Sequence, residues 1–184
     1  MAAGAFVSLP NSSVIDTTKQ VTMFEGYQKC FVTNVSLLYV ADFTNTLVST
    51  ANIVPGGVGT EFPTKGTVLT GATSSATGIV DYIDATSGAA KVYMYTTSGT
   101  WSSGEVVANA AASVSFTLAA GATARPHFYP WTVYGNSSNY GSMPEFASIG
   151  TLYRGRCVLA GNIKYPYQWY VTPSKSLGLS VHCQ

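Results

Sequence analysis

Charged residues are scarce in this chain. They make up 9% of its 184 residues, whereas about a quarter is usual in soluble domains. The nine Lys and Arg residues are scattered, so no basic patch predicts binding of nucleic acid. Only Arg154 and Arg156 are close together, and we expect them to face one side of a strand, as a surface pair or an interface salt bridge. Because 46% of the residues are hydrophobic, the low charge indicates a protein that covers its surface with neighbours and not a disordered chain.

Cysteine is also rare, and the three residues Cys30, Cys157 and Cys183 lack the short spacing of a metal site. Cys30 and Cys157 lie in predicted strands, either as free buried thiols or as a disulfide. Such usage fits a protein made in a reducing cytoplasm. No apolar run reaches the roughly 18 residues of a membrane helix, and the first ten residues do not form a secretion signal. We therefore expect neither membrane insertion nor export.

Motifs of catalysis and cofactor binding are missing. The two histidines, His127 and His182, have no acid and nucleophile nearby in sequence that would predict a triad. Residues 71–78 have glycines at both ends but lack the Lys-Ser/Thr pair of a phosphate loop. Asp81 and Asp84 are expected to face opposite sides of a strand, as surface charges around a turn and not as a calcium site. We predict no enzyme, no catalytic residue, no cofactor and no metal ion.

Helical patterns are lacking too, since no window has an apolar stripe at i, i+3, i+4 and i+7. Short β-branched and aromatic runs between turn residues predict antiparallel strands instead. In the first part of the chain, turns are expected at Glu25-Gly26 and at residues 34–36. In the middle, the predicted strands cover residues 66–70, 77–83, 90–95, 105–107 and 113–118. The predicted fold class is all-β.

Composition divides the chain into three parts. Residues 1–50 and 125–184 are rich in large aromatic side chains, whereas residues 51–124 are mostly Thr, Ser, Ala and Gly. We predict that the two flanks form one discontinuous antiparallel β domain, a sandwich or a meander. Residues 51–124 would form a small Gly/Ser/Thr-rich β module inserted into it.

The most distinctive segment is 151–170. It contains Tyr-Arg-Gly-Arg at 153–156, a strand from Cys157 to Ala160, a Gly-Asn turn, a proline and the pair Trp169-Tyr170. This segment resembles one that is common in structural proteins of tailed bacteriophages. The middle part, with Gly99-Thr-Trp-Ser-Ser-Gly-Glu105, is similar to a small β module of such proteins. The resemblance implies a virion protein of the tail, the head-to-tail connection or the capsid exterior, with itself and other virion proteins as partners.

Aromatic residues are the candidate contact residues. The chain has twelve Tyr and three Trp, and these side chains are enriched in subunit interfaces. Because several lie close to prolines, interface and core packing are favoured over stacking on sugars. A carbohydrate-binding or host-adhesion module of a virion, binding a host-surface glycan, stays the alternative, and a small tail-associated hydrolase is a third hypothesis. The candidate interface or glycan-stacking residues are Trp101, Trp131, Tyr140, Trp169 and Tyr170.

Overall fold

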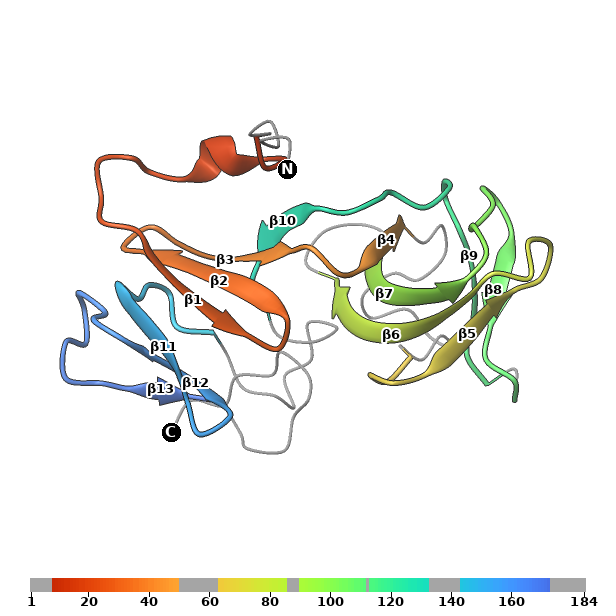
Figure 1. Ribbon diagram of the computed structural model, residues 1–184. Helices are drawn as coiled ribbons and strands as arrows, with labels where there is room; N and C mark the ends of the chain where they lie inside the picture. The colour runs from red at the N-terminus through yellow and green to blue at the C-terminus, as the bar shows by residue number, and fades with distance from the viewer. Residues whose placement is uncertain (1–7, 50–62, 86–89, 112, 133–142, 173–184) are drawn as a thin grey trace, which may run out of the picture.

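The computed structural model describes residues 8–49, 63–85, 90–111, 113–132 and 143–172 (Figure 1). Within these residues the regular structure consists of thirteen strands in three antiparallel sheets and one short 3-10 helix, η1 (Ser12–Val14). The predicted all-β antiparallel class is therefore confirmed.

The first sheet combines strands from both flanks of the chain. Its order is β1 (Thr22–Gly26), β2 (Lys29–Asn34), β3 (Leu37–Asp42) and β10 (His127–Pro130). Alternation along β2 points Phe31 to one side of the sheet and Val32 to the other, and both are buried. Leu9 and Ile15 pack on the Val32 side. The N-terminal segment that carries them runs above the sheet in Figure 1. The four-stranded sheet is therefore the middle layer of this half of the molecule.

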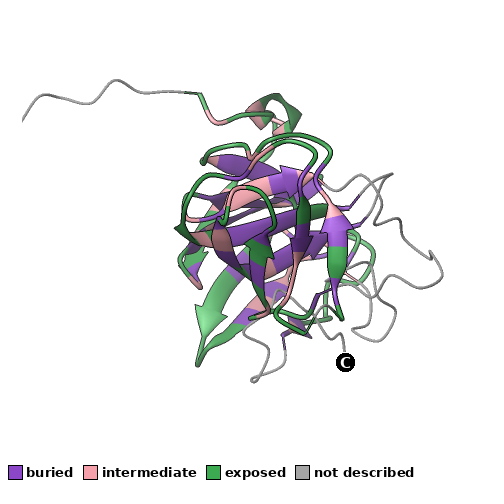
Figure 2. Ribbon diagram, turned by 90° about the vertical axis from the view of Figure 1, so that its right-hand side faces the viewer, coloured by how far each residue is buried: buried purple, intermediate pink, exposed green. Residues whose placement is uncertain are grey.

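The second sheet closes on itself as a small barrel. Its order is β4 (Thr46–Ser49), β7 (Lys91–Ser98), β6 (Thr77–Asp84), β5 (Val68–Gly71), β8 (Val106–Ala108) and β9 (Ser115–Thr117). After β9 the chain returns to the free edge of β4, where Ala119 N–H donates to Ser49 O at 2.8 Å and Thr123 N–H donates to Leu47 O at 2.8 Å. Figure 2 views the molecule from the barrel side, with the buried residues in purple. Closure pairs the edge strands that an open sheet would expose.

The third sheet is small and packs against β1 and β2. It has the order β11 (Ile149–Tyr153), β12 (Arg156–Ala160) and β13 (Tyr170–Val171). The rings of Phe24 and Phe31 stack with centroids 5.1 Å apart. Gly150 of β11 lies against the Phe24 ring, and a Cβ added there would overlap it. The missing side chain at Gly150 lets the two sheets approach closely.

One hydrophobic core connects the three sheets. It includes Phe31 of the first sheet, Val80 and Met94 of the barrel, and Leu159 of the small sheet. The boundary predicted at residue 50 places β4 in the flanking domain, but β4 pairs with β7 of the barrel. The inserted module stays a prediction, whereas its five predicted strands are all found, with ends that differ by a few residues.

Two of the predicted local features are wrong. β1 continues through Gly26, so the chain turns at Tyr27 and Gln28 and not at Glu25-Gly26. Arg154 and Gly155 form the turn between β11 and β12, so Arg154 and Arg156 do not share a strand face. The tight turn at residues 34–36 is confirmed: Asn34 Oδ1 accepts hydrogen bonds from the N–H groups of Ser36 and Leu37.

The two hairpin turns of this half of the molecule are tied together. Tyr27 and Gln28 have φ angles of 52° and 62°, and Arg154 and Gly155 have 49° and 72°. Two-residue turns with both φ angles positive match the twist of the flanking strands and favour glycine or asparagine. The Tyr27 hydroxyl donates a hydrogen bond to the Gly155 carbonyl. Three of these four positions therefore hold side chains in a conformation that L-residues rarely adopt.

We predict that Gln28→Gly stabilises the protein. Gln28 is exposed and left-handed, and this conformation costs a non-glycine residue about 1–2 kcal/mol. Part of this gain is offset by the greater freedom of glycine in the unfolded chain, so we expect about 1 kcal/mol or less. Urea unfolding followed by tryptophan fluorescence measures the difference. Gln28→Ala is the control, because it removes the side chain and keeps the unfavourable φ; equal stability of the two variants would contradict the explanation.

Candidate functional site

Most of the predicted contact residues are not available at the surface. Trp101, Trp131 and Tyr170 are 4%, 3% and 8% exposed and belong to the core, so the expectation that they stack on a partner is corrected to core packing. Tyr140 lies outside the described residues. Trp169 is 70% exposed. Sequence patterns do not separate these roles, because a Trp at a turn is equally suited to core packing and to contact.

Trp101 is held inside the barrel by the Gly-x-Trp-x-x-Gly-Glu segment. Its indole Nε1–H donates to Thr96 Oγ1 at 3.1 Å. Gly99, with a φ of 74°, lies directly on Ala76, where a Cβ would come within 2.8 Å of the Ala76 Cα. The motif therefore has an architectural role in this chain.

Glu105 completes the same structure. Its carboxylate accepts hydrogen bonds from the backbone N–H groups of Ser102 at 2.6 Å and Ser74 at 3.0 Å, and from the Ser74 hydroxyl. Burial acts to raise the pKa of Glu105, but these donors outweigh it and hold the pKa below its ordinary value. An ionised carboxylate engaged in this way ties two loops together and is not a general acid.

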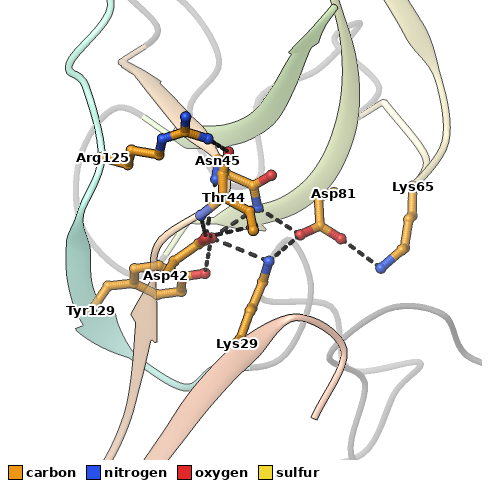
Figure 3. A network of polar contacts seen from close by, with 8 residues as sticks. All are labelled: Lys29, Asp42, Thr44, Asn45, Lys65, Asp81, Arg125 and Tyr129. Carbon is orange, nitrogen blue, oxygen red and sulfur yellow. Dashed lines mark hydrogen bonds and ion pairs between the residues drawn. The ribbon is translucent and has the colours of Figure 1, made fainter. Parts of the chain in front are cut away.

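A second structural carboxylate network joins the first sheet to the barrel (Figure 3). Lys29 Nζ lies 3.2 Å from Asp42 Oδ2 and 2.5 Å from Asp81 Oδ2, and Lys65 Nζ lies 2.6 Å from Asp81 Oδ1. Asn45 Nδ2 donates to both carboxylates, at 2.8 and 2.6 Å. Two cations and two anions make the network neutral, and the Lys29 and Asp42 side chains are 4% and 0% exposed. Asp81, which was expected to be a surface charge, is 21% exposed and is paired with both lysines.

The protonation of both aspartates follows from this arrangement. Burial is the largest influence and acts to raise the pKa of Asp42 and of Asp81. Lys29 outweighs it only together with the hydrogen bonds from Thr44 and Asn45 for Asp42, and together with Lys65 for Asp81, so both pKa values are lower than the ordinary 3.8. Asp42 also accepts hydrogen bonds from the Thr44 and Asn45 N–H groups and from the Tyr129 hydroxyl. With its oxygens engaged and no exposure, Asp42 has no route to a substrate.

This network could not be found from the sequence. Lys29 and Asp81 are 52 positions apart, and neither belongs to a motif. Asp81 reaches Lys29 because the pairing of β6 with β7 shifts register between Val80 and Tyr82. A β-bulge of this kind redirects a side chain. Asp84, the other residue predicted as a surface charge, is buried at 6% exposure.

An aromatic stack with one histidine lies beside the network. The rings of Tyr93 and Tyr129 stack at 4.0 Å, and Tyr82 stacks on Tyr129 at 5.5 Å. His127 meets the edge of Tyr93 at 5.8 Å, and its Nε2 is buried without a hydrogen-bond partner. Burial lowers the pKa of His127, although Asp42 acts against this. His127 is therefore a neutral core residue, while His182 lies outside the described residues.

The described cysteines offer no reactive thiol. Cys30 and Cys157 are free, and burial raises the pKa of both, to about 12 for Cys157. Thiols of this kind are protonated at neutral pH and are poor nucleophiles. In the described ranges no group of three or more His, Cys, Asp or Glu residues is placed to hold a metal ion. The same ranges contain no helix with the length and hydropathy needed to cross a membrane.

The surface feature that stands out is the outer face of the small sheet together with the loop before β13. We call this surface, built by residues 149–169, the aromatic face. It carries six of the sixteen exposed large hydrophobic side chains of the described residues: Ile149, Tyr153, Ile163, Tyr165, Tyr167 and Trp169. Tyr167 is 95% exposed. Large exposed apolar surface marks an interaction site in soluble proteins.

Three cations belong to the aromatic face. Arg154 lies over the Tyr153 ring and Lys164 over the Tyr165 ring, each 5.3 Å from the centroid. Arg156 is exposed on β12, opposite Tyr153. Residues 146–172 contain no Asp or Glu, and the ion pairs within the described ranges involve only Lys29 and Lys65. The aromatic face therefore offers apolar area and three cations that are free of carboxylate partners in those ranges.

We predict that Lys29→Met destabilises the protein by about 3 kcal/mol or more, because it leaves the fully buried Asp42 carboxylate without a cation and Asp81 with Lys65 alone. Lys65→Met is the matched control. Lys65 is 31% exposed, and partly exposed ion pairs contribute about 1 kcal/mol or less. Chemical denaturation of both variants measures the difference. Similar losses for both would contradict the assigned role of Lys29.

A second prediction concerns pH. Since the folded pKa of His127 is lower than the ordinary 6.5, the unfolded chain binds the proton more tightly. Stability is then constant above pH 6.5 and falls as pH drops below it. His127→Gln should remove this part of the dependence and leave the loss at lower pH, where Asp42 and Asp81 are protonated. Denaturation at several pH values tests this, and an unchanged profile in His127→Gln would rule out the assignment.

The comparisons with known proteins found no matching family model, no matching curated protein and no matching solved structure.

Proposed function

We propose that this chain is a non-enzymatic structural component of a bacteriophage particle, in the tail, the head-to-tail connection or the capsid exterior. It acts through subunit interfaces. The observation that carries the proposal is the aromatic face, which is built by the same segment that resembles phage structural proteins. Trp169 and Tyr167 are its most exposed rings, at 70% and 95%.

The composition of the aromatic face supports an interface. Trp, Tyr and Arg are enriched at protein contacts, and they are the side chains that contribute most to binding energy. Ile149, Tyr153 and Arg156 extend the face across β11 and β12. Such area would be costly to leave in water, so a neighbouring subunit is the expected cover.

The chemistry of the buried polar groups supports a non-enzymatic role. Asp42, Asp81 and Glu105 are engaged in ties between strands and loops. His127 is enclosed by aromatic rings. These groups hold the fold together, and none of them is arranged as a nucleophile with a base and an orienting acid.

The alternative function is a carbohydrate-binding or host-adhesion module of a virion. It is favoured by the exposed rings of Tyr165, Tyr167 and Trp169, since flat aromatic side chains can stack on sugars. Trp101 and Trp131 no longer support it, because both are in the core. Glycan-array binding that is lost in a folded Trp169→Ala variant would favour this alternative over the structural role.

Mass spectrometry of purified virions tests the proposal. We expect the chain in particles of the phage that encodes it, in a fixed ratio to the major structural proteins. In a complementation experiment, Trp169→Ala with Tyr167→Ala should reduce incorporation about tenfold or more, because a central aromatic residue contributes about 2 kcal/mol or more to binding. Tyr95→Ala is the control, since Tyr95 is 54% exposed on the barrel. A chain present in infected cells and absent from particles would refute the proposal.

A further inference from the structure

We infer that the aromatic face of one copy binds the opposite side of a second copy, at Met23 and Glu25, so that copies join head to tail. This inference rests on the proposed function and specifies its partner. It follows from the charges on the two sides of the four-stranded sheet.

Charge disfavours packing of the aromatic face against its own equivalent in a second copy. A symmetric contact would bring Arg154, Arg156 and Lys164 of each copy together, with no carboxylate in residues 146–172 to neutralise them. Like charges brought together at an interface cost several kcal/mol. The partner surface must therefore combine apolar area with carboxylates.

This chain has such a surface at the edge strand β1. The register pairs Met23 with Val32 and Glu25 with Cys30, on the side covered by the N-terminal segment. Phe24 points the other way, toward Gly150 of the small sheet. Met23 is 66% exposed and Glu25 is exposed without an ion pair in the described residues. We call this surface the acidic edge.

The acidic edge has further members that fit the same partner. Val14 and Val21 are 46% and 37% exposed and belong to the segment that leads into β1. Asp16 is partly exposed in this segment, next to the exposed Lys19. Apolar side chains flanked by carboxylates complement the aromatic face, whose rings are flanked by arginine and lysine.

The two surfaces lie on opposite sides of the four-stranded sheet, the N-terminal segment above it and the small sheet below it in Figure 1. A contact between two different surfaces of identical chains leaves one of each free at the ends. Such a heterologous contact continues into rings or filaments. This is the geometry that a tail, connector or shell component requires.

Charge reversal tests the pairing. Arg154→Glu with Arg156→Glu inverts the aromatic face, and Glu25→Arg inverts the acidic edge. Sedimentation of the full chain should show association of the natural protein, and about tenfold or more weaker association of each variant alone. An equal mixture of the two variants should regain association. The acidic aromatic face of the arginine variant then meets the basic edge of Glu25→Arg, and the natural aromatic face of Glu25→Arg meets the natural acidic edge of the arginine variant.

Thr70→Glu is the control, because Thr70 is exposed on the barrel and a carboxylate there should leave association unchanged. Recovery in the mixture also demonstrates that both variants are folded, and circular dichroism checks each alone. Folded variants that do not recover on mixing would overturn the inference, as would unimpaired association of either one.

Two other outcomes identify a different partner. A natural protein that stays monomeric at high concentration overturns the head-to-tail contact, while its presence in virions would still support the structural role. Binding of polygalacturonate without self-association, lost in the arginine variant, would assign the aromatic face to an acidic glycan and also overturn the inference.

Discussion

The ion-paired contact of Lys29 with Asp42 and Asp81 fixes how the four-stranded sheet sits on the barrel. Lys29 comes from β2, Asp42 from β3 and Asp81 from β6, so one ammonium group joins strands of two sheets. The contact is buried, and a buried charge is tolerated only when it is paired and hydrogen-bonded. Its geometry therefore restricts the two sheets to one relative orientation, which the stacked tyrosines beside it reinforce.

The two sides of the four-stranded sheet are covered by other parts of the chain. The N-terminal segment covers one side of the first sheet, and the small sheet covers part of the other. The small sheet packs against the first sheet with one side only. Its inner residues Leu159 and Tyr170 are therefore buried, while its outer residues meet solvent. A sheet with one open face usually alternates apolar and polar residues. Here the open face is also apolar, which is why a partner is expected on it.

Local patterns predicted much of this fold. Alternating β-branched residues predicted the strands of the barrel, and Asn34 predicted the turn that follows β2. Both features depend on residues that are close together in the sequence. The turn at Tyr27-Gln28 lacked glycine and was missed, and the burial of Trp101 and Trp131 depended on packing between distant segments. The ion pair of Lys29 with Asp81, 52 positions away, depended on the β-bulge between Val80 and Tyr82 and had no signal in the sequence. For the candidate site, the sequence indicated Trp169 and the pair Arg154 and Arg156, but not that these cations lie beside exposed aromatic rings, because that placement depends on the turn between β11 and β12.

Hydroxyl-radical footprinting of intact virions most directly tests whether the aromatic face is the buried surface. The method oxidises exposed Trp, Tyr and Met side chains, and the free chain exposes Tyr95, Tyr167 and Trp169. We predict that Tyr167 and Trp169 are protected in the particle, relative to the dissociated protein, while Tyr95 is oxidised at the same rate in both. Oxidation of Tyr167 and Trp169 that is as fast in the particle as in the free chain would contradict the central claim.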